Sequence, residues 1–287
     1  MRLATAWVDG SSRLFVETPT GLLDLAARIP DLAAIRDVKG LLEAGPDTRA
    51  RLEGVAEDET GPRSRLEDLH LSAPVINPPK LIGIGLNYRA HAAEGGDELP
   101  PKPIVFAKFA NSVIGSGENI VHPHITESLD YEGELGVVIG RRTKDLTVEE
   151  AAHAVAGFLV ANDVSARDIQ EGDPASQWVR GKSLDTFAPL GPYFVTADSV
   201  DEWRDLRIRT WVNGELRQNE VCGDMVFGVE ELVSFVSQDV TLAPGDIILT
   251  GTPSGVGAGF TPPRWLRRGD VVEVEITGLG RLTSPVV

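Results

Sequence analysis

The chain has 287 residues, with 43 Asp and Glu against 27 Lys and Arg, which gives a formal net charge of −16. This acidic balance argues against a nucleic-acid partner, because phosphate binding needs a basic surface. The single cysteine, Cys222, excludes an internal disulfide and a thiolate metal cluster, and is more typical of inert packing than of a nucleophile. There is no apolar run of ~18 residues for a membrane span, and Asp9-Gly10 interrupts the first apolar run too early for a signal peptide. We expect a soluble, cytoplasmic protein that binds neither membranes nor nucleic acid.

The first seventy residues differ in pattern from the rest. They begin with a predicted hairpin around Asp9-Gly10, and Leu and Ala then recur at helical spacing in residues 22–29, 32–44 and 47–55. The polar segment 58–65 contains Gly61 and Pro62 and predicts a linker. We therefore expect a small α+β N-terminal domain at residues 1–70 and a larger domain at residues 71–287.

Strand patterns dominate the second domain. They fall at residues 80–86, 104–109, 129–139, 157–162, 193–195, 208–212, 246–250 and 271–276. Asn213-Gly214 predicts a hairpin, and helices are predicted at 147–155, which opens with a capping-type Thr147…Glu150, and at 229–238. Because strands outnumber helices without regular alternation, we expect a mostly β fold with some α, a mixed and mostly antiparallel β-roll.

The predicted strand at 129–139 carries an unusual pair of acids. Side chains on a strand alternate between faces, so Glu132 and Glu134 project to one side, and Asp130 is expected there too. Like charges about 6–7 Å apart on a half-buried face repel each other and need a cation or a proton to coexist. The alternative is a solvated outer face, for which a Glu-x-Glu pattern is common.

A hard divalent cation is the simplest partner for these carboxylates. We expect Asp163, which ends the apolar strand 157–162, to be the third ligand. Oxygen ligands of this kind favour Mg²⁺ or Mn²⁺, and also accept Ca²⁺.

Six sequence blocks, taken in order, resemble the fumarylacetoacetate hydrolase family over residues 78–285. They are Gly85-Leu-Asn-Tyr-Arg-Ala-His91-Ala-Ala-Glu94, Pro103-Ile-Val-Phe-Ala-Lys108, Asp130-Tyr-Glu-Gly-Glu-Leu135, Asn162-Asp-Val-Ser-Ala-Arg-Asp-Ile-Gln170, Gln177-Trp-Val-Arg-Gly-Lys-Ser183 and Thr250-Gly-Thr-Pro-Ser-Gly-Val-Gly257. The resemblance implies the β-roll fold, usually a homodimer, and a metal held by Glu132, Glu134 and Asp163.

The resemblance also suggests the acid–base groups. His91 and Glu94 share a face if they lie on a helix, and the resemblance implies a catalytic histidine here, with the glutamate forming a dyad. The alternative from spacing alone is an exposed histidine paired on a helix surface. Lys182 matches the family's active-site lysine. Further expected substrate contacts are Tyr88, Arg89, Lys108, Gln170 and Thr252.

Several reactions fit such a site, because a chelated 2-oxo acid can form an enolate that the metal stabilises. The first expectation is hydrolysis of a C–C bond in an acylpyruvate. The alternatives are decarboxylation of an oxaloacetate-like acid, isomerisation of a 2-hydroxy-diene-dioate, and a metal-stabilised scaffold without turnover. The expected partner in each enzymatic case is a small 2-oxo acid. Four tryptophans are expected to be core or interface anchors, namely Trp178, Trp203, Trp211 and Trp265.

Overall fold

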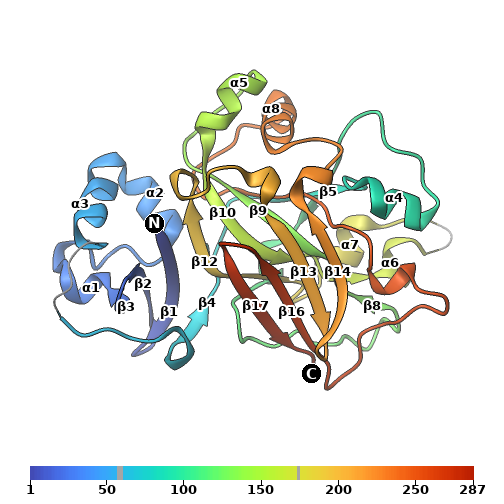
Figure 1. Cartoon of the computed structure of the whole chain (residues 1–287), viewed down its shortest axis with the longest axis horizontal. Coiled ribbons are helices and arrows are strands. Elements are labelled where there is room, and N and C mark those ends of the chain that lie inside the picture. Colours follow the sequence, from blue (N-terminus) through green and yellow to red (C-terminus); the bar gives the residue numbers. More distant parts are fainter. Residues whose placement is uncertain (57–60, 173–174) are drawn as a thin grey trace.

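The computed structural model describes residues 1–56, 61–172 and 175–287, so residues 58–60 of the predicted linker lie outside the described part. Within these ranges, no helix combines the length and the apolar character needed to cross a membrane. Figure 1 shows that sheets make up the centre of the molecule and that helices lie around them. This arrangement confirms the prediction of a mostly β fold with some α.

The largest sheet has eleven strands and is mostly antiparallel. Its main path runs β3-β2-β1-β12-β10-β9-β15-β5-β6, with β4 on β1 and β7 on β12. Only β15 with β5 and β12 with β7 pair in parallel among the strands of the described part. The strands are β1 (Arg2–Val8), β2 (Ser11–Thr18), β3 (Gly21–Asp24), β4 (His70–Ser72), β5 (Leu81–Gly85), β6 (Ile104–Lys108), β7 (Val113–Ile114), β9 (Gly133–Ile139), β10 (Val155–Asn162), β12 (Ala188–Thr196) and β15 (Ile247–Leu249).

A second, four-stranded sheet packs over β9, β10 and β12 (Figure 1). Its strands, in the spatial order β14-β13-β16-β17, are β14 (Glu215–Val221), β13 (Arg207–Val212), β16 (Val271–Ile276) and β17 (Gly280–Pro285). Asn213 and Gly214 join β13 to β14 with φ angles of 52° and 77°, as the predicted two-residue hairpin requires. The apolar residues that alternate along β13 and β16 face the large sheet and fill the core between the two layers.

Eight α-helices are described, most of them short. They are α1 (Leu25–Arg28), α2 (Val38–Ala44), α3 (Pro46–Ala56), α4 (Arg89–Gly95), α5 (Val148–Ala151), α6 (Arg167–Gln170), α7 (Trp178–Lys182) and α8 (Val229–Asp239). The predicted capping box at the start of α5 is present, with Thr147 and Glu150 bonded to each other's backbone N–H. The prediction of a helix over residues 22–29 is wrong at its start. Leu22 and Leu23 pair with β2 in strand β3, and this tertiary pairing overrides their helical spacing.

The N-terminal segment is joined to the rest of the molecule through the sheet. Strand β1 pairs with β12, with Leu3 opposite Phe194, so the large sheet continues across residue 70 (Figure 1). Leu3 and Phe194 also belong to one buried hydrophobic cluster, to which α2 contributes Val38 and Leu41. The division into two domains near residue 70 stays a prediction.

The acidic segment 129–139 is not one strand, as the sequence predicted. A short β8 (Leu129–Asp130) pairs with β11 (Ser165–Ala166), and β9 begins only at Gly133, so Glu132 lies in the break. The backbone N–H of Glu132 donates to Asn162 Oδ1 at 3.0 Å, and the N–H of Asp163 donates to the Glu132 carbonyl at 2.8 Å. These two bonds hold the break against the end of β10.

Candidate active site

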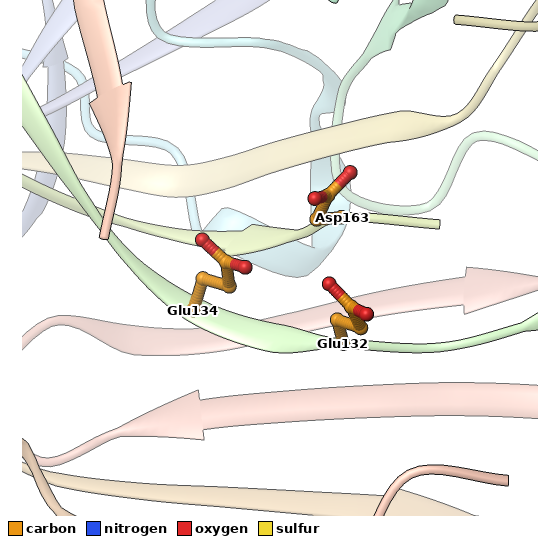
Figure 2. Close-up of side chains that lie close together, drawn as sticks. All are labelled: Glu132, Glu134 and Asp163. Carbon is orange, nitrogen blue, oxygen red and sulfur yellow. The ribbon is translucent and has the colours of Figure 1, made fainter. Parts of the chain in front are cut away.

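Three buried carboxylates meet where β9 and β10 lie side by side. Glu134 projects from β9, Glu132 from the residue just before that strand, and Asp163 from the residue just after β10 (Figure 2). One oxygen from each lies within 4.8 Å of those of the other two, and the residues are 5, 1 and 0 % exposed for Glu132, Glu134 and Asp163. The predicted convergence of these three side chains is therefore present in the fold.

Three buried cations surround this trio. Lys182 at the end of α7 donates to Glu132 Oε2 at 2.8 Å and to Asp163 Oδ2 at 2.7 Å. Lys108 at the end of β6 lies 2.6 Å from Asp163 Oδ1. Arg167 at the start of α6 lies 2.7 Å from Glu132 Oε1. Each carboxylate oxygen of Asp163 and of Glu132 therefore has a cationic neighbour.

Glu134 is in a different electrostatic situation. The Gly251 N–H donates to its Oε2 at 2.8 Å, but burial and the neighbouring charges of Asp163 and Glu132 raise the pKa of Glu134 well above its usual value. Burial also opposes the ionisation of Glu132, yet Lys182 and Arg167 outweigh it and lower the pKa of Glu132 to about 2. The trio thus has one member that the protein alone does not stabilise as an anion.

A divalent cation fits this arrangement. Among the described residues the cluster holds four carboxylates, with Asp130 the fourth, against the three cations, so it has one excess negative charge when all are ionised. A divalent ion would relieve the repulsion at Glu134 and leave one excess positive charge for an anionic ligand. The all-oxygen donor set is of the kind that hard divalent cations prefer, and the choice between Mg²⁺ and Mn²⁺ stays a prediction.

Asp130 is not part of the trio. Its carboxylate accepts from the N–H groups of Gly257 and Ala258, at 2.7 and 3.1 Å, and from Arg167 Nε at 2.9 Å. The prediction that Asp130 projects to the same side as Glu132 and Glu134 is wrong, because the strand is broken at residues 131–132. Asp130 instead holds the guanidinium of Arg167 through Nε, and Nη1 of the same guanidinium contacts Glu132.

Of the trio, Glu132 lies in the lining of a cavity of about 560 Å³, and the predicted dyad lies in the lining of the same cavity. His91 and Glu94 both lie on α4, with His91 Nδ1 and Glu94 Oε2 3.5 Å apart, which confirms their shared helix face. Glu94 also accepts from the Gly255 N–H at 2.9 and 3.1 Å. His91 is close enough to Glu132 to lower that residue's pKa. The dyad therefore lies within electrostatic reach of the carboxylates.

The other predicted contacts separate into two groups. Gln170 and Thr252 lie in the cavity lining with Lys182, and Thr252 also donates to the Gly133 carbonyl at 2.9 Å, next to Glu134. Three others do not lie in that lining. Tyr88 is fully buried, and Lys108 is buried in contact with Asp163. Arg89 donates to the carbonyls of residues 224 and 225. Their assignment as substrate contacts stays a prediction.

Arg167 was missed in the sequence, although its geometry places it in the cavity lining. It is 7 % exposed, and its Nη2 is buried and has no hydrogen-bond partner among the described residues. The signal was present, because Arg167 and Gln170 are three residues apart in the block that begins with Asn162. In α6 the two side chains bond to each other at 3.0 Å.

The fold and this site define a member of the fumarylacetoacetate hydrolase family. The family description "Fumarylacetoacetate (FAA) hydrolase C-terminal" matches residues 80–287, and the chain belongs to this family. It is 45% identical over 267 residues to the oxaloacetate tautomerase FAHD2B, mitochondrial, of Bos taurus, covering 93% of this chain and 84% of that protein. It is also 45% identical over 225 residues to the oxaloacetate tautomerase YisK of Bacillus subtilis, covering 77% and 74%.

Solved structures agree on the whole fold. The fumarylacetoacetate hydrolase of Exiguobacterium antarcticum superposes with a TM-score of 0.84 at 36% identity, over 100% of this chain and 99% of that one. The 2-hydroxyhepta-2,4-diene-1,7-dioate isomerase of Mycobacterium marinum gives a TM-score of 0.75 at 31% identity, over 100% and 98%. The likeness therefore includes the N-terminal segment, which the family description does not cover.

Proposed function

We propose that this chain is a divalent-metal enzyme that interconverts the enol and keto forms of oxaloacetate or a closely related 2-oxo dicarboxylate. The observation that carries the proposal is one cavity lined by Glu132 of the carboxylate trio and by a His–Glu dyad. The relatives named above as oxaloacetate tautomerases support this substrate, since one of them is 45% identical over 93% of the chain. We also propose Mg²⁺ or Mn²⁺ as the resident ion.

The proposed reaction moves protons and breaks no carbon–carbon bond. The enol oxygen loses a proton, and carbon 3 gains one, so the two forms differ only in where that proton lies. We assign the proton at carbon 3 to His91, with Glu94 orienting the imidazole. The ammonium of Lys182 and the guanidinium of Arg167 would stabilise the negative charge on the enolate oxygen and on a substrate carboxylate. The bound ion would supply Lewis-acid stabilisation of that oxygen.

The first expectation from sequence was hydrolysis of an acylpyruvate, and the relatives favour its alternative. Hydrolysis would require the same dyad to activate a water molecule, whereas tautomerisation needs no attacking water. The isomerase from Mycobacterium marinum supports a second candidate, the isomerisation of a 2-hydroxy-diene-dioate, because that reaction is also a proton transfer through a dienolate. Decarboxylation of oxaloacetate remains a third.

One set of assays separates tautomerisation from decarboxylation and from hydrolysis. Purified protein is incubated with Mn²⁺ and three substrates: enol-oxaloacetate, followed by loss of its enol absorbance; keto-oxaloacetate, followed by pyruvate formation; and an acylpyruvate, followed by loss of its dioxo absorbance. Metal without protein is the blank, since free ions also act on oxaloacetate. We expect rapid enol decay that Asp163→Asn abolishes. Acylpyruvate cleavage with no effect on enol decay would overturn the proposal in favour of hydrolysis.

A further inference from the structure

A second cavity, of about 790 Å³, adjoins the one lined by Glu132 and the His91–Glu94 dyad, which we call the carboxylate cavity. We call the second cavity the apolar annex. It is lined mainly by β6 and α7, with Ile104, Val105, Phe109, Val179 and Leu184 among its apolar residues. Val105 and Phe109 are 46 and 57 % exposed, so the annex opens to solvent at the edge of the large sheet.

Two aromatic side chains stand between the two cavities. Phe106 and Trp178 occur in both linings, together with Ser176. Their rings meet edge to face, with centroids 5.6 Å apart and planes at 68°. Lys182 Nζ lies 5.1 Å from the centroid of Phe106, so the same ring borders the ammonium that binds Glu132 and Asp163. The pair therefore separates a charged cavity from an apolar one.

The backbone beneath makes room for both rings. Gly83 and Gly85 lie on the same face of β5, two residues apart. A Cβ on Gly83 would lie 2.1 Å from Phe106 Cζ, and a Cβ on Gly85 would lie 2.4 Å from Trp178 Cζ3. The rings can lie this close to the strand only because both positions lack a side chain, so their placement is set by the strand as well as by their own packing.

We infer that the Phe106–Trp178 pair is a partition that determines substrate length. It closes the carboxylate cavity so that a short, doubly charged 2-oxo acid fits, and it keeps an apolar chain on carbon 3 or beyond out of the annex. This inference rests on the proposed function for the 2-oxo acid class. Trp178 is then a specificity-determining residue, beyond the core or interface anchor expected from sequence.

Binding measurements test the partition without relying on turnover. Calorimetry on the Mn²⁺-loaded protein compares oxalate, a short chelator, with 2-oxooctanoate, which chelates through one carboxylate and its keto oxygen and carries an apolar tail. Trp178→Ala should improve the affinity for 2-oxooctanoate relative to oxalate at least about tenfold, as expected when an apolar pocket gains several methylenes. Trp211→Ala is the matched control, since Trp211 lies on β13 and packs against Arg281. Its affinity ratio should equal that of the wild type.

A second variant keeps the indole but moves it. Gly85→Ala places a methyl group where Trp178 now lies, and should shift the ratio in the same direction. Ratios within about twofold of wild type in both variants would overturn the partition, as would loss of oxalate binding in Trp178→Ala, which would assign Trp178 to the chelating end. Enol-oxaloacetate decay measured in the wild type tests the proposed function separately, because the binding ratio does not depend on which reaction follows.

Discussion

Replacing Glu134 by Gln should stabilise the metal-free protein and remove most of its response to metal. The amide oxygen of Gln can still accept from the Gly251 N–H, so the 2.8 Å hydrogen bond is kept while the charge is lost. The change thus isolates the electrostatic cost that we attribute to the trio. It alters neither Lys182 nor its two carboxylate partners.

The size of the effect follows from the geometry. Two carboxylate oxygens 4.8 Å apart repel by roughly 3–4 kcal/mol at an effective dielectric constant of about 20. Lys182 offsets part of this repulsion, so we expect Glu134→Gln to raise the free energy of unfolding by about 2 kcal/mol at pH 8, or ~4 °C in Tm. The pKa of Glu134 is raised in the folded state, so the folded state keeps a proton that the unfolded chain loses above the usual value of 4.5. Wild-type stability should therefore fall relative to the variant as pH rises above 4.5.

Thermal unfolding of chelator-treated protein between pH 5 and pH 8, with and without Mn²⁺, measures both effects. A Mn²⁺ concentration a hundred times Kd should stabilise the wild type by about 2.7 kcal/mol and Glu134→Gln much less. Glu149→Gln, an exposed residue in the first turn of α5, is the control for loss of one negative charge. The reasoning is refuted if metal-free Glu134→Gln is less stable than wild type at pH 8 and still gains the full increment from Mn²⁺.

Three further predictions concern the neighbours of this carboxylate. His91→Asn should lower kcat for enol decay by about 10²–10⁴-fold while the Mn²⁺-induced rise in Tm is unchanged; loss of that rise would show that His91 supports the metal site. Gly259→Ala places a Cβ 2.2 Å from Glu94 Cδ and should lower kcat about tenfold by moving that carboxylate, whereas Gly54→Ala in α3, whose Cβ would meet no atom of the described residues within 4 Å, should leave kcat unchanged. The pKa of Glu132 is depressed to about 2 from its usual 4.5, so its contribution to metal-free stability is present above pH 4.5 and is lost as pH falls toward 2, by ~3 kcal/mol. A Glu132→Gln variant whose acid-unfolding profile matched that of wild type would contradict this.

The sequence predicted the carboxylate trio because its signal is local and lies in blocks that resemble the fumarylacetoacetate hydrolase family. Glu132 and Glu134 are two residues apart, and Asp163 directly follows a strong apolar strand pattern, so each position is read from its immediate neighbours. The break at Tyr131 and Glu132 was not predicted. It depends on hydrogen bonds to Asn162 and Asp163, about thirty residues away, which no local pattern reports.

The partition between the two cavities also could not be predicted from local sequence patterns. Nothing in the sequence places Trp178 of α7 against Gly85 of β5, because that contact follows from the way in which the helix packs on the edge of the sheet. Likewise, Leu22 and Leu23 have helical spacing but are recruited into a strand by β2. Whether a segment forms a helix or a strand was predictable where its own pattern is strong. The prediction failed where pairing with a distant segment determines the structure.

The pairing of β1 with β12 has a consequence for how the chain is made. Leu3 and its partner Phe194 are about 190 residues apart, so at ~5–20 residues per second of synthesis the first strand waits roughly 10–40 s for the edge that receives it. The N–H of Gly251, which anchors Glu134, emerges later still. The nascent chain therefore carries Glu134 well before its hydrogen-bond donor has been synthesised, and the carboxylate trio is among the last parts of the molecule to become native.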